Sequence, residues 1–284
     1  MSSFININGT LFPEEEDSLP ATSRAISYGD GCFETLVSYK SKFLHFEDHF
    51  ARLQSGLKYL EMNLDLTKEQ LLSEIQKLLE KNELEDENSV VRIQCYREGS
   101  SGYFDISDQS GFIISNRSIP ERGDSIKLKT VSIPAIPTAA LDRKVKLSNS
   151  INYIKAAQEA IKKGGDDALM LTVDLKISET TISNIFWIKG NQVFTPSANC
   201  DLLPGVTRSI LIELIDQDSE LELMEGEFEL QDIYSAEAVF CTNSVMEMKP
   251  VAGVDDQLYK KEHSVFEKLK NDFKAYKERY LKGD

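Results

Sequence analysis

Apolar side chains in the N-terminal part of the chain follow two different periods. Between residues 47 and 60 they recur at steps of three and four, which predicts a helix with one buried stripe. A second helix is expected to begin at Thr67, because its hydroxyl can cap the first turn while Gln70 reaches back. Short apolar runs bounded by turn residues predict strands at 4–8, 33–39, 42–46, 90–96 and 111–115.

The C-terminal part mixes strand and helix patterns in a similar way. A helix is expected from about Ser148 to Lys163, and Gly164 ends it because glycine tolerates a left-handed backbone. Two further helices are expected to start near Thr207 and near His263. Apolar runs predict strands at 126–133, 168–173, 182–188 and 193–195. Strands and helices are mixed without βαβ regularity, so we expect an α+β fold.

A polar segment around residues 117–125, which contains Pro120 and Gly123, has the composition of a connector between packed units. At 284 residues the chain has the length for two domains. We therefore expect a small N-terminal α+β domain of residues 1–117, a linker of residues 118–124, and a larger C-terminal α+β domain of residues 125–284.

The composition is that of a globular protein, with 41% hydrophobic and 28% charged residues. The formal net charge of −15 disfavours contact with a phosphate backbone, so no nucleic-acid partner is expected. No stretch approaches the ~20 apolar residues that span a bilayer, and the N-terminus lacks a signal-peptide pattern. We therefore expect a cytoplasmic protein without a membrane partner. Four separated cysteines and three histidines predict neither a metal site nor a disulfide framework.

Two residues stand out as candidates for chemistry. Lys146 lies between Val145 and Leu147, and a lysine desolvated by apolar neighbours becomes a nucleophile toward carbonyl groups. The alternative is a solvated surface lysine. Glu179 lies in a strand-like stretch where hydroxyls crowd, and hydrogen bonds there can keep its carboxylate ionised, so that it can keep a ring nitrogen protonated. The alternative is an exposed acid at the end of a strand.

Three further features are compatible with anion binding. The turn from Leu203 to Thr207 precedes a helix, and backbone N–H groups at a helix start attract phosphate. Arg52 lies at the edge of the apolar stripe of its helix, where it can reach either an anion or solvent. Arg97 can clamp a substrate carboxylate or decorate a loop. For each of them a purely structural role remains open.

Five blocks in a fixed order carry a family resemblance that extends from about Ser23 to Val251. They resemble the class IV aminotransferases, the fold-type IV pyridoxal 5′-phosphate (PLP) enzymes. This family includes branched-chain aminotransferase, D-amino-acid aminotransferase and aminodeoxychorismate lyase. The blocks are SRAISYGDGCFET (23–35), EDHFARL (47–53), KLSNSINYIKAAQEA (146–160), ETTISNIFWIKGNQVFTP (179–196) and LLPGVTR (202–208).

The resemblance implies roles for individual residues and a two-domain architecture like that of D-amino-acid aminotransferase. By it, Lys146 is the Schiff-base lysine and proton carrier, located in the C-terminal domain, and Glu179 faces the pyridine nitrogen. No metal is implied. The remaining cofactor ligands implied are Arg52, Leu203, Gly205, Val206, Thr207 and Ser244. The implied substrate-binding residues are Phe33, Arg97, Asn243 and Ser244.

The resemblance implies transamination between an amino acid and a 2-oxo acid, of the branched-chain type, in a homodimer. The block CTNSVMEMKPV (241–251) is closest to aminodeoxychorismate lyases, so elimination to p-aminobenzoate and pyruvate is an alternative. The segment that starts at Arg97 lacks the second arginine common in those lyases, and the Gly-Thr-Ala-Ala loop of branched-chain aminotransferases is absent. A PLP-binding protein without efficient turnover is a third possibility.

Overall fold

The computed structural model describes residues 3–16, 22–99, 102–104, 107–121 and 123–283. Ser100 and Ser101, in the segment after Arg97, and Arg122 of the expected linker lie outside these ranges. The chain divides into two compact units, Met1–Pro120 with Val145–Asn149, and Glu121–Lys144 with Ser150–Asp284. The short segment that carries Lys146 therefore packs with the first unit, whereas the resemblance had placed it in the C-terminal domain.

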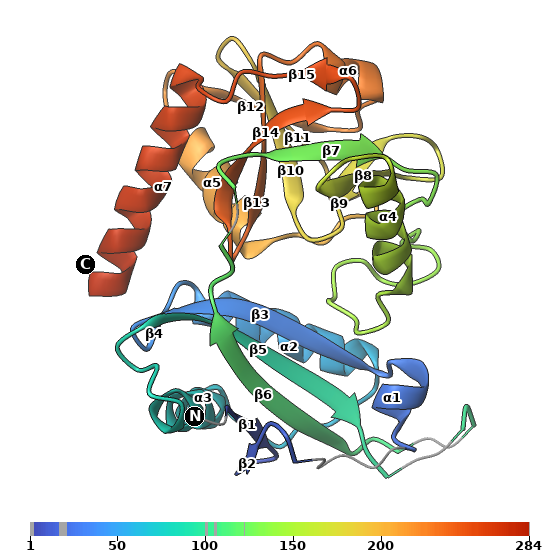
Figure 1. Cartoon of the computed structure of the whole chain (residues 1–284), viewed down its shortest axis with the longest axis vertical. Helices are drawn as coiled ribbons and strands as arrows, with labels where there is room; N and C mark the ends of the chain where they lie inside the picture. The colour runs from blue at the N-terminus through green and yellow to red at the C-terminus, as the bar shows by residue number, and fades with distance from the viewer. Residues whose placement is uncertain (1–2, 17–21, 100–101, 105–106, 122, 284) are drawn as a thin grey trace. The chain divides into compact units, whose positions relative to one another are not determined.

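The first unit contains β1 (Phe4–Ile7), β2 (Thr10–Pro13), α1 (Arg24–Tyr28), β3 (Gly31–Tyr39), β4 (Lys42–Phe43), α2 (Phe46–Tyr59), α3 (Lys68–Lys81), β5 (Asn88–Arg97) and β6 (Ser110–Ser118). Its strands form one antiparallel sheet in the order β2-β1-β6-β5-β3-β4 (Figure 1). Helix α2 packs against β3, and α3 packs against β6 and β1. The sheet thus presents β3 and β5 as a long central pair.

Local sequence signals explain most of this unit. Thr67 and Gln70 form the expected capping box at the start of α3, with Gln70 N–H donating to the threonine hydroxyl. Strand β2 and helix α1 were not predicted. Helix α1 buries no residue, so no apolar period marks it; it is fixed instead by Ser23 at its start and by Gly29, whose φ of 64° ends it.

The second unit contains β7 (Ile126–Thr130), α4 (Ile151–Lys162), β8 (Asp167–Leu171), β9 (Ile177–Thr180), β10 (Asn184–Lys189), β11 (Gln192–Pro196), α5 (Val206–Asp216), β12 (Glu222–Gly226), α6 (Leu230–Tyr234), β13 (Ala238–Asn243), β14 (Glu247–Val254), β15 (Gln257–Leu258) and α7 (Ser264–Lys282). Its nine-stranded mixed sheet runs β12-β11-β10-β13-β14-β7-β8-β9, with β15 paired to β14. Helix α4 packs against β8 and β7, and α5 packs against α7 (Figure 1).

Burial explains only in part which strands of the second unit the sequence predicts, because β9 and β13 are almost entirely buried and were not predicted. Strand β10 is almost entirely buried, and Trp187 packs there among aliphatic and aromatic side chains. The strand expected at 182–188 begins only at Asn184, because Ile182 is half exposed and lies in the connection after β9. Strand β12, which pairs with β11 in parallel, was not predicted either. Its residues are only partly buried or exposed, so they form no clear apolar run.

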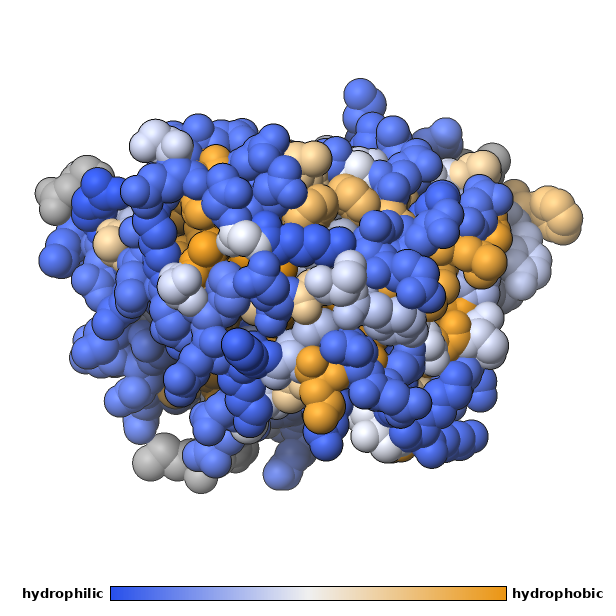
Figure 2. All heavy atoms as spheres, turned by 90° about the horizontal axis from the view of Figure 1, so that it is seen from above, coloured by the Kyte–Doolittle hydropathy of each residue, from blue (hydrophilic) through white to orange (hydrophobic). Residues whose placement is uncertain are grey.

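The face shown in Figure 2 is covered mainly by hydrophilic side chains, in keeping with a net charge of −15. Apolar side chains appear on it in small patches. In the part of the chain that the structure describes, no helix combines the length and apolar character needed to cross a membrane.

Candidate functional site

Lys146 is fixed by its backbone to the end of β3. The Phe33 N–H donates to the Lys146 carbonyl at 2.9 Å, and the Ser148 N–H donates to the Gly31 carbonyl at 2.9 Å. Cys32 and Leu147 face each other in an antiparallel bridge. Val145 and Leu147 are buried while Lys146 is only partly buried, as in a strand whose alternate side chains point to opposite sides. The backbone of Lys146 is therefore held in place by hydrogen bonds, and its side chain is not that of a fully solvated surface residue.

The ring of Phe33 lies next to the lysine amine. Lys146 Nζ is 4.9 Å from the ring centroid, and Arg92 Cζ is 3.7 Å from it. Both distances are within the range of a cation–π interaction. Phe33, expected as a substrate-binding residue, thus lies beside the candidate nucleophile.

Arg52 takes part in a buried ion-pair cluster with Glu34 and His49. Its Nε and Nη2 donate to the two oxygens of Glu34 at 2.6 and 2.9 Å, and His49 Nδ1 lies 2.8 Å from Glu34 Oε2. Burial acts to raise the pKa of Glu34, but the charge and hydrogen bonds of Arg52, with those of His49, outweigh it and lower that pKa to about 2. Arg52 is therefore held in a fixed orientation and does not extend into solvent.

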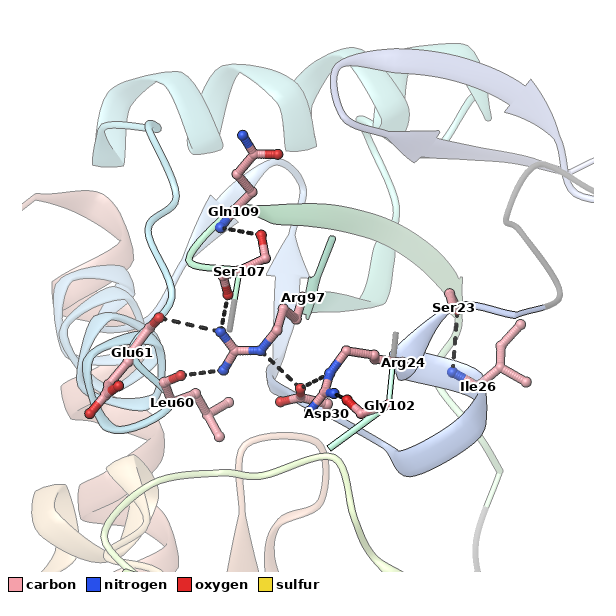
Figure 3. A network of polar contacts seen from close by, with 10 residues as sticks. All are labelled: Ser23, Arg24, Ile26, Asp30, Leu60, Glu61, Arg97, Gly102, Ser107 and Gln109. Carbon is pink, nitrogen blue, oxygen red and sulfur yellow. Dashed lines mark hydrogen bonds and ion pairs between the residues drawn. The ribbon is translucent and has the colours of Figure 1, made fainter. Parts of the chain in front are cut away.

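Arg97 joins three loops of the first unit (Figure 3). Its Nε donates to Asp30 Oδ2 at 2.9 Å, and the same oxygen accepts a 2.7 Å hydrogen bond from Arg24 Nε. Its two Nη atoms donate to the carbonyl oxygens of Leu60 and Ser107. Because Nε and both Nη atoms bond to the protein itself, the geometry favours a structural role for Arg97 over the expected clamp on a substrate carboxylate.

Glu179 is a buried carboxylate of the second unit that accepts hydrogen bonds on both of its oxygens. It lies in β9 with 5% of its surface exposed. Its Oε1 accepts a hydrogen bond from the Tyr153 hydroxyl at 2.8 Å, and Arg143 Nη2 lies 3.6 Å from the same oxygen. Its Oε2 accepts from the Leu203 N–H at 3.1 Å and from Asn184 Nδ2 at 3.3 Å. Such donors stabilise the ionised form, so Glu179 is not an exposed acid at a strand end.

The donors to Glu179 are not the hydroxyls that crowd around it in sequence. Thr180 and Ser183 bond to each other, with 2.7 Å between their hydroxyl oxygens. Thr181 bonds instead to Asp167. The sequence therefore indicated correctly that hydrogen bonds hold this carboxylate but was wrong about which groups make them.

Asn184 connects Glu179 with the turn that precedes α5. Its Nδ2 also donates to the Leu203 carbonyl at 2.8 Å. A Cβ atom at Gly205 would lie only 2.3 Å from Asn184 Oδ1, so the close approach requires glycine at this position. Gly205 is the N-cap of α5 and provides no side-chain hydrogen bond, and Thr207 in the first turn is buried. The first N–H groups of α5 have no acceptor within the helix, which suits an anion.

Asn243 ends β13 and shapes the turn that leads to β14. Its Oδ1 accepts from the N–H groups of Val245 and Met246 at 2.9 and 2.7 Å, and its Nδ2 donates to the Ile182 carbonyl at 3.0 Å. These bonds favour a role in holding the turn over direct contact with substrate. Ser244 lies in this turn, between β13 and β14.

Sequence reasoning missed Arg143 and Tyr153, which contact Glu179, and Glu34 and His49, which contact Arg52. Only His49 had a local signal, because it lies three positions before Arg52 and so shares a helix face with it. The others are 18 to 36 positions away from the residue that they support. Such long-range partners are set by the fold and leave no spacing pattern in the sequence.

Residues 31–254 match the family described as amino-transferase class IV, and the chain belongs to this family of PLP-dependent enzymes. It is 31% identical over 267 residues to the aminodeoxychorismate lyase of Bacillus subtilis, covering 90% of this chain and 88% of the relative. It is 29% identical over 276 residues to a putative branched-chain-amino-acid aminotransferase of Methanocaldococcus jannaschii, covering 95% of each.

Solved structures confirm the expected fold. The branched-chain aminotransferase of Thermoproteus uzoniensis, solved with norvaline, matches with a TM-score of 0.90 at 23% identity, covering 100% of this chain and 96% of that chain. The branched-chain aminotransferase of Escherichia coli matches with a TM-score of 0.89 at 22% identity, covering 97% of this chain and 94% of that chain. The architecture is therefore that of the fold-type IV PLP enzymes.

Proposed function

We propose that this protein is a class IV aminotransferase that transfers the amino group of a branched-chain-like amino acid to a 2-oxo acid, with Lys146 as the Schiff-base lysine. The observation that carries the proposal is the environment of Glu179. A buried carboxylate with donors on both oxygens is well suited to hold a proton on a pyridine nitrogen.

The residues of the second unit fit a phosphorylated pyridine. Glu179 would bond to the ring nitrogen. The Leu203 N–H donates to Glu179, and the side chain of Leu203 would pack against the ring. The first turn of α5, which Gly205 opens and which contains Val206 and Thr207, offers N–H donors to the phosphate. The Nε of Arg143 is buried, and the described residues provide no hydrogen-bond partner for it. A polar group of a bound ligand would be a suitable partner, because buried donors are normally hydrogen-bonded.

Four residues have supporting roles in the same proposal. Arg52 would bind the phosphate. Glu34 would orient the guanidinium of Arg52, because a bidentate ion pair fixes the plane of a guanidinium. Ser244, carried on the turn that Asn243 holds, would add a hydroxyl donor to the phosphate. Phe33 would line the substrate side next to Lys146.

When bound, PLP supplies a carbonyl carbon that reacts with amines and an electron sink for the bond to the substrate α-hydrogen. The amine of Lys146 would hold the cofactor at rest and, once displaced by the substrate amine, would remove the Cα proton and return it. Glu179 would keep the ring nitrogen protonated throughout. In transamination the Lys146 amine would carry this proton from the substrate, and the expected kinetics are ping-pong.

Aminodeoxychorismate lyase activity is the second candidate. It is favoured by the 31% identity to the Bacillus subtilis lyase and by the block that contains Asn243 and Ser244. The same lysine and carboxylate would serve, and the substrate would lose a β-substituent to give p-aminobenzoate and pyruvate. The side chains that contact the substrate would decide between the two outcomes. A homodimer and a cytoplasmic location stay predictions.

An assay of the purified, PLP-loaded protein tests the proposal. The protein is incubated separately with branched-chain L-amino acids plus a 2-oxo acid, with D-alanine plus a 2-oxo acid, and with aminodeoxychorismate. Formation of the keto acid of a branched-chain donor supports the first candidate, and p-aminobenzoate with pyruvate supports the second. Visible cofactor absorbance without any of these products contradicts both and indicates a PLP-binding protein without turnover.

A further inference from the structure

The two oxygens of Glu179 are held by different kinds of donor. Oε2 receives a backbone N–H and an amide N–H, both neutral. Oε1 receives the hydroxyl of Tyr153 and lies 3.6 Å from the cationic guanidinium of Arg143. Oε1 of Glu179 therefore has a nearby positive charge in addition to a hydrogen bond, whereas Oε2 has only neutral donors.

Arg143 and Tyr153 are joined in series with the carboxylate. The Nη2 of Arg143 donates to the Tyr153 hydroxyl oxygen, and the hydroxyl donates its own proton to Glu179 Oε1. The guanidinium also lies 5.2 Å from the centre of the tyrosine ring. A hydroxyl that accepts from a cation becomes a stronger donor, so the arginine strengthens the bond from tyrosine to carboxylate.

Arg143 is buried, and its guanidinium is only partly paired. Its side chain is 7% exposed, and its Nε is buried without a hydrogen-bond partner among the described residues. An incompletely paired buried cation costs stability. A residue kept under that condition next to a functional carboxylate has a role in the charge of the site.

We propose that Arg143 and Tyr153 are positioning residues that act through Glu179: together they keep its carboxylate ionised and turned toward the cofactor ring nitrogen. The inference rests on the proposed function, since it assigns Glu179 to that nitrogen. Neither residue contacts the reacting carbon in this assignment. Their substitution changes the cofactor's electronic state before it changes substrate binding.

The decisive variant is Tyr153→Phe, which removes the hydroxyl and keeps the ring. Loss of one hydrogen bond to a charged group corresponds to roughly tenfold to a hundredfold in an equilibrium, so kcat should fall by about tenfold or more with KM for the amino donor nearly unchanged. In the holoenzyme, the pH midpoint of the visible Schiff-base absorbance should move upward. A neutral ring nitrogen withdraws fewer electrons, and the imine then holds its proton to higher pH.

Two comparisons make the test specific. Arg143→Lys keeps a cation and should recover part of the wild-type midpoint, while Arg143→Gln should resemble Tyr153→Phe. The matched control is Tyr234→Phe, which removes a tyrosine hydroxyl that donates to another carboxylate of the same unit, Asp255, at 2.7 Å. This control should leave both the midpoint and kcat unchanged.

A double variant separates positioning from a general loss of structure. In a Glu179→Gln background, Tyr153→Phe should have no additional effect on the absorbance midpoint, because its target is gone. An unchanged midpoint in Tyr153→Phe, or a full additional shift in the double variant, would overturn the inference while leaving the proposed function intact. Absence of any visible cofactor absorbance in the wild-type protein would instead overturn the proposed function itself.

Discussion

At the scale of single residues, the chemistry depends on one amine held against a strand. Both neighbours of Lys146 are buried, and its carbonyl accepts from the Phe33 N–H at 2.9 Å. A flexible four-carbon side chain thereby starts from a fixed backbone. The sequence could predict this lysine from its apolar flanks and its family block, but the pairing with β3 depends on chain segments more than a hundred positions apart.

Replacement of this lysine is the most direct test. Lys146→Ala should abolish the visible Schiff-base absorbance and lower turnover by several orders of magnitude, because the amine both holds the cofactor and moves the proton. The measurements are an absorbance spectrum after PLP addition and the rate with the best amino donor. The control is Lys144→Ala, two positions away and exposed, which should leave both unchanged. Full activity in the alanine variant would remove the central assignment.

A second residue-scale prediction concerns Glu34, whose pKa is lowered from 4.5 to about 2 by Arg52 and His49 against the effect of burial. A carboxyl with a depressed folded-state pKa stabilises the fold above its unfolded pKa, and this contribution is lost as the pH falls through the folded value. The shift corresponds to stability on the order of 3 kcal/mol near neutral pH, fading between about pH 4.5 and pH 2.

The variant Glu34→Gln should therefore unfold at lower denaturant concentration than wild type at pH 7. The difference in unfolding free energy should shrink steadily as the pH is lowered below about 4.5. Glu87→Gln, at an exposed position, provides the comparison and should track wild type at every pH. A pH-independent difference for Glu34→Gln would contradict the ionic origin of its contribution.

At the scale of elements, local signals predicted most helices and few of the contacts that build the site. The capping box of Thr67 and Gln70 is visible in four consecutive residues, and α3 begins where it predicts. The donors to Glu179 come from α4, from β10 and from the turn before α5, up to 26 positions away. A spacing rule detects neighbours on one helix or strand, and only the complete sheet brings these elements together.

The turn before α5 gives an element-scale prediction. Gly205 has φ −74°, which any residue adopts, so its constraint is the 2.3 Å approach of a Cβ to Asn184 Oδ1. Gly205→Ala should push Asn184 away from both Leu203 and Glu179 and weaken PLP binding by about tenfold, the equivalent of one hydrogen bond. The dissociation constant is read from the absorbance or fluorescence of the apoprotein titrated with PLP.

Gly123→Ala is the control for this prediction. A Cβ there meets nothing closer than 3.9 Å, and the position has no positive φ. It should bind PLP like wild type. If Gly205→Ala also binds like wild type, the contact between Asn184 and the turn does not contribute to the cofactor site.

At the scale of the whole molecule, the first unit leaves several large apolar side chains exposed, among them Ile26, which Figure 3 shows near Ser23. Phe104 is 98% exposed and Ile26 is 62% exposed, and the rings of Tyr28 and Tyr103 lie 4.8 Å apart. A group of exposed apolar residues is typical of a surface that binds another protein. Since soluble oligomers are most often twofold symmetric, a second copy of the chain is the expected partner.

Sedimentation equilibrium should therefore give a mass of twice the 32.0 kDa of the chain. Phe104→Asp places a charge on the proposed interface and should shift the mass toward that of one chain, because burying an unpaired carboxylate is costly. Leu258→Asp, which substitutes an apolar residue 71% exposed in the second unit, should remain dimeric. A monomeric wild-type protein that still turns over its substrate would show that one chain provides all the residues the reaction needs.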